Sequence, residues 1–220
     1  MPRFLDVVLS GLALLILSPF LLPVALILRL TGEREVFYLQ KRVGRNRRYF
    51  GVYKFATMKK NSPSMGAGTI TLKDDPRVLP LGKFLRKTKI NELPQLLNIV
   101  LGDMALVGPR PLVIEGEKKY DESAAARIRS VRPGLTGLGS LLLGDEEGLY
   151  SHRPDAAEFY SSVIMPYKQT LELYYVENRS FWLDMMIILL TIAAVVYPSF
   201  DPEKLLDGVP PAPAQIREVR

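Results

Sequence analysis

The side chains with the clearest capacity for chemistry are one carboxylate, Glu92, and a set of basic residues at predicted turns of the central segment. The basic residues that stand out between positions 34 and 137 are Arg42, Lys54, Lys59, Arg77, Arg86, Arg110 and Arg132. Arginine presents a planar fork that matches phosphate, and lysine acts as a point charge. A carboxylate among such cations can hold Mg²⁺, which prefers one or two carboxylates together with substrate phosphates. The pattern therefore indicates a diphosphate substrate or, alternatively, a basic surface that binds anionic lipid.

The composition of the 220-residue chain narrows the class of protein. Hydrophobic residues make up 48% and charged residues 24%, which argues against a disordered chain. A formal charge of +6 suits nucleic acid, anionic lipid or phosphorylated small molecules. No recognised nucleic-acid motif accompanies this charge, so no nucleic acid partner is expected. Cysteine is absent from the sequence, which excludes disulfides and thiolate metal sites.

The N-terminal segment predicts a membrane element. Residues 7–28 carry no charge over 22 positions, which is long enough to cross a bilayer. Pro19 lacks a backbone donor and so kinks or breaks a helix, while the neighbouring Ser18 can bond a freed carbonyl. Seven basic residues between positions 29 and 48 mark that flank as cytoplasmic. These features fit a kinked spanning helix and a re-entrant helix, which enters and leaves on one side, about equally well.

Several further elements must position the chemistry. Residues 36–43 and 49–58 are expected to form two strands joined by a basic turn, followed by a short basic helix over 79–87. Apolar residues recur at helical spacing over 93–101, Gly102 is a fitting stop, and Asn91 is a candidate N-cap. The remaining expected segments are a mobile loop over 61–68, helices over 114–131 and 156–178, and a short apolar run over 185–197 that favours an interfacial or core helix.

Ordered motifs extend along almost the whole chain. Besides Ser18 and Pro19 in the apolar run, the motif segments are 36–44, 53–55, 75–78, 81–88, 92–96, 102–104, 107–111, 132–137 and 174–178. With these motifs spread over residues 1–195, the chain resembles the bacterial sugar transferases, which are monotopic polyprenol-phosphate phosphoglycosyl transferases. The resemblance implies that a phosphosugar moves from a UDP-sugar to undecaprenyl phosphate with release of UMP. Such a step initiates lipid-linked polysaccharide or glycan biosynthesis.

The resemblance also implies a fold and a location. The fold would be α/β and mainly helical, in a monotopic protein of the bacterial inner membrane with its catalytic domain on the cytoplasmic face. The resemblance favours the re-entrant helix, kinked at Ser18 and Pro19, with interfacial amphipathic helices around the catalytic domain. Membrane lipid is then a partner, and a homodimer is compatible with the sequence. The expected divisions are a membrane helix (1–32), a catalytic domain (33–180), an interfacial helix (181–198) and a flexible tail (199–220).

Individual side chains receive roles from the same resemblance. Glu92 would help to hold Mg²⁺, the implied cofactor, and would form the catalytic pair with Asn91. Positive charge and the divalent ion would neutralise charge that develops on the transferred phosphoryl group. The expected substrate-binding residues are Lys54, Arg86, Pro109, Arg110, Pro111 and Arg132.

The catalytic pair departs from the family pattern at Asn91, because the family carries an aspartate there that attacks the sugar-bearing phosphorus. An amide cannot take that role in the usual way. Either Glu92 or a carboxylate of residues 145–147 supplies the nucleophile, or the polyprenyl phosphate attacks directly. Alternatively the asparagine is an engineered substitution, or the protein is a silent relative that binds nucleotide-sugar or scaffolds a glycan pathway. We favour a natural, active variant.

Two smaller departures concern the substrate contacts. The segment 138–147 lacks a basic residue that many relatives place there, and it carries three acids instead. Glu172 stands where relatives tend to carry aspartate, which keeps the charge. The sequence therefore leaves open whether residues 138–147 contact the nucleotide.

Overall fold

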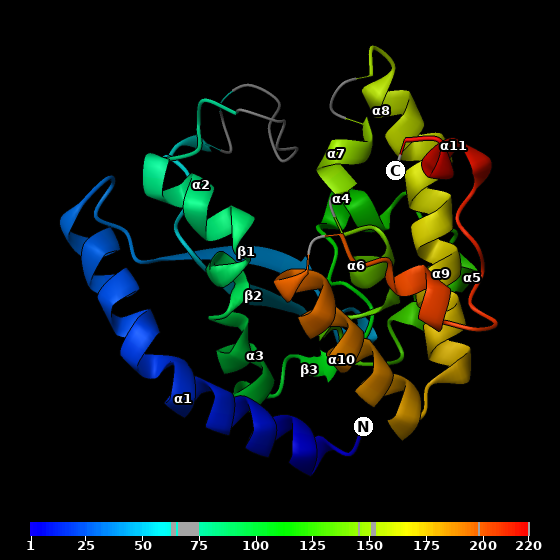
Figure 1. The fold of residues 1–220 in the computed structure, drawn as a ribbon, viewed down its shortest axis with the longest axis horizontal. Helices are drawn as coiled ribbons and strands as arrows, with labels where there is room; N and C mark the ends of the chain where they lie inside the picture. Colours follow the sequence, from blue (N-terminus) through cyan, green and yellow to red (C-terminus); the bar gives the residue numbers. More distant parts are fainter. Residues whose placement is uncertain (63–64, 66–74, 145, 151–152, 198, 220) are drawn as a thin grey trace.

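The computed structural model describes residues 1–62, 65, 75–144, 146–150, 153–197 and 199–219. Within these residues the protein is mainly helical, as expected, and has two small two-stranded sheets, of which the sequence predicted one (Figure 1). The loop predicted over 61–68 lies mostly outside the described residues. The helices are α1 (Arg3–Leu30), α2 (Pro80–Lys87), α3 (Gln95–Leu101), α4 (Ile114–Glu117), α5 (Glu122–Ile128), α6 (Leu138–Leu142), α7 (Glu146–Tyr150), α8 (Ala156–Phe159), α9 (Met165–Asn178), α10 (Phe181–Val196) and α11 (Ala214–Arg217).

Helix α1 runs without a break through Pro19 and Pro23 and curves along the outside of the molecule (Figure 1). Pro19 offers no N–H to the carbonyl of Leu15, and the Ser18 hydroxyl donates to that carbonyl at 2.8 Å. The serine thus satisfies the acceptor that the proline leaves, as predicted. The helix is long and apolar enough to cross a membrane, and only 6% of its most apolar window of 18 residues is buried. This exposure distinguishes α1 from the core helix of a soluble protein.

One side of α1 contacts the rest of the protein at both ends. Near its start, Arg3 Nη1 donates to the carbonyl of Met104 at 2.9 Å, and Asp6 Oδ1 accepts from the N–H of Leu106 at 3.0 Å. Near its end, Leu28 is buried in a cluster with side chains of β2 and α2. The opposite side exposes large apolar side chains, namely Phe4, Leu15, Ile16, Phe20, Leu22, Leu26 and Leu30.

The predicted hairpin is confirmed by strands β1 (Phe37–Val43) and β2 (Tyr49–Phe55), which pair antiparallel along their whole length. The basic turn between them contains a short 3₁₀ helix, η1 (Arg45–Arg47). Aromatic and β-branched residues favour such a pleated pair. The hairpin supplies one wall of the site described below.

The region that follows the hairpin differs from the prediction at one point. Gly102 ends α3 with a left-handed φ of 106°, as a C-terminal glycine should. The N-cap of α3, however, is Pro94, and Asn91 lies one turn earlier in the 3₁₀ helix η3 (Ile90–Glu92) without capping α3. The N-cap prediction for Asn91 was therefore wrong, because residues 90–92 already form a turn of their own.

The charged stretch predicted as one helix over 114–131 forms two short helices, α4 and α5. Asp121 separates them, because its carboxylate accepts from the N–H of Ala124 at 3.1 Å and so starts α5 as an N-cap. The helix predicted over 156–178 is present as α8, a single π turn called η4 (Tyr160–Ile164) and α9.

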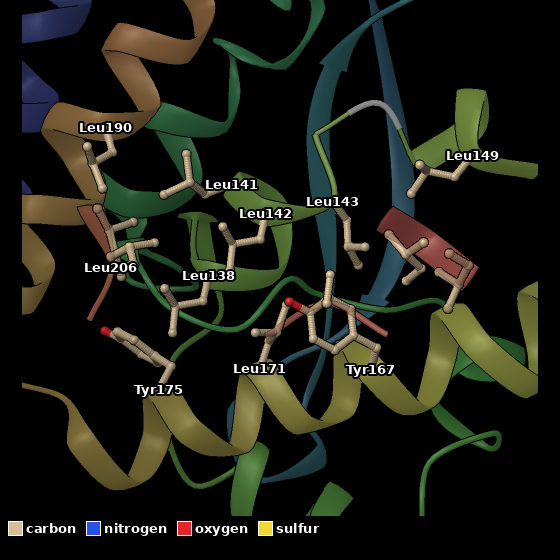
Figure 2. Close-up of a cluster of buried hydrophobic side chains, with 14 of the residues drawn as sticks. Leu138, Leu141, Leu142, Leu143, Leu149, Tyr167, Leu171, Tyr175, Leu190 and Leu206 are labelled. Atoms are coloured by element: carbon tan, nitrogen blue, oxygen red, sulfur yellow. The ribbon is translucent and has the colours of Figure 1, made fainter. Parts of the chain in front are cut away.

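The largest hydrophobic cluster lies between α6, α9 and α10 (Figure 2). Leu138, Leu171 and Ile187 are each fully buried in it. Helix α10 turns one side to this cluster and exposes Trp182 and Leu189 on the other. The apolar run that the sequence assigns to an interfacial or core helix thus combines a core side with an exposed side.

The C-terminal segment does not form the flexible tail that its prolines suggest. It contains the 3₁₀ helix η5 (Pro202–Leu205) and helix α11, and it buries Leu206, Ala212 and Ile216 in the largest cluster. The Tyr167 hydroxyl of α9 donates to the Pro210 carbonyl at 3.1 Å. Apolar residues placed between the prolines reach the core, which composition alone did not reveal.

Candidate active site

Two cations share one face of the β1–β2 hairpin. Lys54 is the register partner of Tyr38, and Arg42 is the partner of Phe50. Side chains alternate between the faces of a strand, and register partners lie on the same face. Tyr38 and Arg42 are four positions apart, so Lys54 and Arg42 project from the same face.

Glu92 reaches these cations from the short helix η3. The chain enters η3 through Lys89, which has a left-handed φ of 59°, a conformation that costs a non-glycine residue about 1–2 kcal/mol. Glu92 Oε1 accepts from Lys54 Nζ at 3.0 Å and from Arg110 Nη2 at 3.0 Å. A single carboxylate oxygen therefore joins the hairpin to the segment that carries Arg110.

Arg110 is positioned by a parallel pair of short strands, β3 (Ala105–Val107) and β4 (Gly134–Thr136). The chain approaches itself closely beside this pair, because a Cβ on Gly134 would come within 2.1 Å of the Gly108 nitrogen. Only glycine permits that approach. The turn 109–111 follows β3 directly.

The backbone of Arg110 is fixed as well as its side chain. Pro109 and Pro111 have no N–H, so Arg110 carries the only backbone donor of its turn. That N–H donates to Glu172 Oε1 of α9 at 3.1 Å. A Cβ on Gly139 would come within 2.6 Å of the same oxygen, so the glycine leaves room for the carboxylate.

The electrostatic balance keeps Glu92 ionised. Burial alone would raise the pKa of Glu92, but Arg110 and Lys54 outweigh burial and hold it well below its ordinary value. Burial, assisted by repulsion from Arg110 and Arg42, lowers the pKa of Lys54 to about 8 despite the attraction of Glu92. Burial, assisted by repulsion from Arg110, lowers the pKa of Arg42 to about 10. The group therefore holds more cations than one carboxylate can compensate.

Further charged residues on α9 adjoin this group. Lys168 and Glu172 lie one helical turn apart, and Lys168 Nζ contacts Glu146 Oε2 at 2.7 Å. Glu172 is 1% exposed, and its Oε2 has no hydrogen-bond partner in the described part of the chain. Burial raises the pKa of Glu172 to about 7, against the stabilising effects of the Arg110 N–H and of Lys168. These residues extend the charged site along α9.

The comparison with known proteins identifies the family. A family model described as bacterial sugar transferase matches residues 1–198. The chain belongs to the bacterial sugar transferase family. The resemblance drawn from the sequence motifs is therefore confirmed.

Three curated relatives illustrate the similarity. The exopolysaccharide production protein ExoY of Sinorhizobium fredii is 36% identical over 207 residues, which cover 88% of this chain and 84% of ExoY. The undecaprenyl-phosphate glucose phosphotransferase of Komagataeibacter xylinus is 36% identical over 89% of this chain and 36% of that protein. The UDP-N-acetylgalactosamine-undecaprenyl-phosphate N-acetylgalactosaminephosphotransferase of Aeromonas hydrophila is 33% identical over 88% and 43%, respectively. The chain thus spans most of ExoY and less than half of the other two relatives.

In this sugar transferase the position next to Glu92 has an unusual environment. Asn91 is 8% exposed, and its Oδ1 has no hydrogen-bond partner among the described residues. A buried amide oxygen without a partner costs about 1–3 kcal/mol. Water or a bound ligand can supply such an oxygen with a donor.

The other residues expected to bind substrate occupy different places. The Pro109 carbonyl accepts from the N–H of Gly134 at 2.9 Å, and the Pro111 carbonyl accepts from Arg42 Nη1 at 3.2 Å, so both prolines frame Arg110. Arg86, on α2, donates to Met58 Sδ at 3.7 Å. Arg132 Nε donates to the Gly102 carbonyl at 3.0 Å, at the end of α3. The substrate contacts of all six expected residues stay predictions.

The ligand set of this sugar transferase is compatible with Mg²⁺ only if substrate completes it. In the described residues no three His, Cys, Asp or Glu side chains gather as a potential metal site. Both cations contact Oε1 of Glu92, so the second oxygen of the carboxylate is engaged by neither of them. One carboxylate plus substrate phosphates is a coordination that Mg²⁺ commonly accepts.

Lys168 joins the site although the sequence did not single it out. Arg42 stood out among the basic residues of the sequence but was not among the expected substrate-binding residues. The signal for Arg42 is its register, because it shares a hairpin face with Lys54. The signal for Lys168 is its spacing of four residues from Glu172, which places both on one side of a helix. Neither signal identifies a site until the hairpin and α9 are known to meet at Arg110.

Proposed function

We propose that this chain transfers a phosphosugar from a UDP-sugar to undecaprenyl phosphate and thereby initiates the assembly of a lipid-linked polysaccharide. The observation that carries the proposal is the Glu92 carboxylate shared between Lys54 and Arg110 in a largely buried group with excess positive charge. Relatives whose names specify an undecaprenyl-phosphate acceptor and a UDP-sugar donor support these substrate classes.

The proposed reaction requires phosphate binding and charge stabilisation. An oxygen of the polyprenyl phosphate bonds to the sugar-bearing phosphorus, and the oxygen that bridges the two phosphorus atoms leaves with UMP. Arg110 and Lys54, oriented by Glu92, stabilise the negative charge that grows on the transferred group and on the leaving oxygen. Direct transfer needs no nucleophile at Asn91. On a covalent route, a protein carboxylate would first attack the sugar-bearing phosphorus and release UMP. The lipid phosphate would then attack the same phosphorus and displace the carboxylate.

Mg²⁺ is the proposed cofactor, and Glu92 is its proposed carboxylate ligand. The support is the second oxygen of Glu92, which neither Lys54 nor Arg110 engages. When bound, the ion supplies additional positive charge to the diphosphate. Lys54 and Arg110 keep Glu92 ionised and therefore ready to bind a cation.

We also propose that α1 is re-entrant, kinked at Ser18 and Pro19, and that the catalytic domain lies on the cytoplasmic face of the bacterial inner membrane. The 28 residues of α1 extend about 42 Å, more than the bilayer core of about 30 Å. A straight spanning helix would therefore place its ends on opposite sides of the membrane. The contacts of both ends with one domain, through Arg3 and through Leu28, support the re-entrant alternative.

The cytoplasmic orientation and the contact with lipid have independent support. The seven basic residues between positions 29 and 48 favour the cytoplasmic side for the end of α1. The exposed apolar sides of α1 and α10 are suited to contact with lipid. Membrane lipid is thus a proposed partner of both helices.

UMP release tests the proposed reaction. Purified protein in detergent is incubated with Mg²⁺, undecaprenyl phosphate and a panel of UDP-sugars. We expect UMP with at least one sugar and only when the lipid phosphate is present. Glu92→Gln should lower the rate by about 100-fold or more. Glu35 forms an exposed ion pair with Lys60, with 2.9 Å between Lys60 Nζ and Glu35 Oε1. Glu35→Gln removes that carboxylate and should leave the rate unchanged. Equal rates in the two variants would contradict the assignment of Glu92.

A non-catalytic member of the family that binds nucleotide-sugar is the second candidate, and Asn91 is the observation that favours it. UDP-sugar binding to the purified protein without UMP release for any sugar of the panel would support this candidate. Restoration of UMP release by Asn91→Asp would then locate the missing group at position 91.

A further inference from the structure

Lys168 is a buried cation whose charge is compensated by a side chain at the edge of the site. The Lys168 side chain is 4% exposed, and its ammonium contacts the Glu146 carboxylate at 2.7 Å. Glu146 is the first residue of α7, and its side chain is 24% exposed. An ammonium in such surroundings is costly to leave without an anion. The anion that compensates Lys168 is therefore Glu146, whose side chain is partly exposed to water.

Lys168 is connected to the proposed active site through Glu172. Glu172 lies one turn away on α9 and accepts the backbone N–H of Arg110 at 3.1 Å. Glu92, and to a lesser degree Glu146 and Glu172, raises the pKa of Arg110, so all three carboxylates lie within electrostatic reach of that guanidinium. The charges alternate along a series that consists of Glu146, Lys168, Glu172, Arg110, Glu92 and Lys54.

The net charge of these residues would match that of a diphosphate if the diphosphate replaced the Glu146 carboxylate. With every group ionised, four cations (Arg42, Lys54, Arg110 and Lys168) face three carboxylates (Glu92, Glu146 and Glu172). Removal of the Glu146 carboxylate leaves an excess of two positive charges. The diphosphate of a nucleotide-sugar carries about two negative charges, one for each phosphate.

We propose that Lys168 binds a phosphate oxygen of the nucleotide-sugar, and that Glu146 is a placeholder that pairs with Lys168 until this phosphate displaces it. The inference rests on the proposed function and adds a substrate-binding residue to it. The exchange costs little, because Lys168 is paired with an anion before and after binding. The Glu146 carboxylate then moves to water, which its partial exposure permits.

Calorimetric titration of the full-length protein in detergent with UDP tests the proposal without turnover. Glu146→Gln should tighten UDP binding about 5- to 10-fold, because the amide competes poorly for the ammonium. Lys168→Met should weaken binding about 10-fold or more. The double variant should resemble Lys168→Met alone, because Glu146 has nothing to mask once the ammonium is gone. Glu35→Gln is the matched control, because it also removes one carboxylate from a lysine–glutamate ion pair, the exposed pair of Glu35 with Lys60. This variant should bind UDP as the unaltered protein does.

Two outcomes would overturn the proposal. In the first, Glu146→Gln unfolds at a lower temperature and binds UDP no more tightly than the unaltered protein. This result would show that the ion pair is a purely structural contact. Unaltered UDP binding by Glu146→Gln together with loss of a phosphosugar adduct in mass spectrometry would make Glu146 a nucleophile. Glu146→Gln removes only a partly exposed charge, so it remains informative if Lys168→Met does not fold. Because UDP binding needs no catalysis, these results are separate from the UMP assay.

Discussion

The backbone N–H of Arg110 donates to the Glu172 carboxylate at 3.1 Å, and it is the only N–H of a turn that has proline on both sides. Two carboxylates from distant parts of the chain thus hold one arginine. Glu172 fixes its backbone, and Glu92 fixes its guanidinium at 3.0 Å. In the proposed function, an arginine held in this way is oriented for phosphate before the substrate arrives.

Substitution of Glu172 tests whether the acceptor or the charge matters. Glu172→Gln keeps an acceptor for the Arg110 N–H, so we expect UMP release within about twofold of the unaltered protein. Glu172→Ala leaves that N–H without a partner and opens a cavity, and it should lower the unfolding free energy by about 2–4 kcal/mol. Urea unfolding and UMP assays measure both effects. If glutamine proves as damaging as alanine, the hydrogen bond to Arg110 is not the function of Glu172.

The raised pKa of Glu172 predicts a pH dependence of stability. The pKa of Glu172 in the folded protein is about 7, above the ordinary glutamate value of 4.5. Between pH 4.5 and 7 the folded protein therefore holds a proton that the unfolded chain has lost. The unfolding free energy should therefore fall as the pH rises from 4.5 through 7, by at most about 3 kcal/mol. Urea unfolding of the protein and of Glu172→Gln at several pH values measures this contribution. Parallel pH profiles for the two proteins would contradict the prediction.

Lys54 predicts a pH dependence of substrate binding. Burial lowers its pKa to about 8, so above that pH the ammonium loses its proton and its attraction for phosphate. We expect the KM for UDP-sugar to rise above about pH 8. In Lys54→Arg the guanidinium stays charged, so this rise should disappear even if the overall rate falls. An alkaline rise in KM that persists in Lys54→Arg would assign it to another group.

Asn91→Asp tests the covalent route at the position where the resemblance drawn from the sequence implies an aspartate. The substitution places a carboxylate beside Glu92 at a buried site whose amide oxygen has no partner among the described residues. We expect a phosphosugar adduct at position 91 after incubation with UDP-sugar in the absence of lipid acceptor. Mass spectrometry of peptides locates the adduct, and the unaltered protein should have none at Asn91. An adduct on the same peptide position in both proteins would exclude this interpretation.

The topology of α1 predicts the accessibility of the N-terminus. The chain contains no cysteine, so Pro2→Cys introduces a single reactive thiol at an exposed position. With a re-entrant helix, a membrane-impermeant maleimide should label this thiol only after the cells are permeabilised. A cysteine at Val219, which is 43% exposed, serves as the matched control for the side proposed to be cytoplasmic. Labelling of position 2 in intact cells would establish a spanning helix instead.

The parts of the fold that depend on neighbouring residues were predictable from the sequence. The hairpin, α2 and the end of α3 at Gly102 follow from strand propensity, helical spacing and a left-handed glycine. The hydrogen bond from Ser18 to Leu15 follows from the proline beside it. Each of these features is decided within a few residues, so tertiary contacts did not alter them.

The parts that failed or were missed depend on distant contacts. The C-terminal segment looked flexible because of its prolines, but Ile216 is fully buried against a cluster formed elsewhere in the chain. The helix predicted over 114–131 is divided where Asp121 caps a new helix. The pairing of Lys168 with Glu146 needs α7 and α9 to meet, and a single sequence gives no measure of that approach.

The contact of α1 with the domain along one side has a practical consequence for protein production. Ala13, Leu14 and Leu17 of α1 cover a cluster that includes Ile99 and Met104, both fully buried. A shortened gene that starts after the helix would leave this cluster open to water, and the product would aggregate. The helix proposed to enter the membrane therefore also covers part of the protein's hydrophobic core, and we expect that the whole chain has to be purified in detergent or a lipid nanodisc.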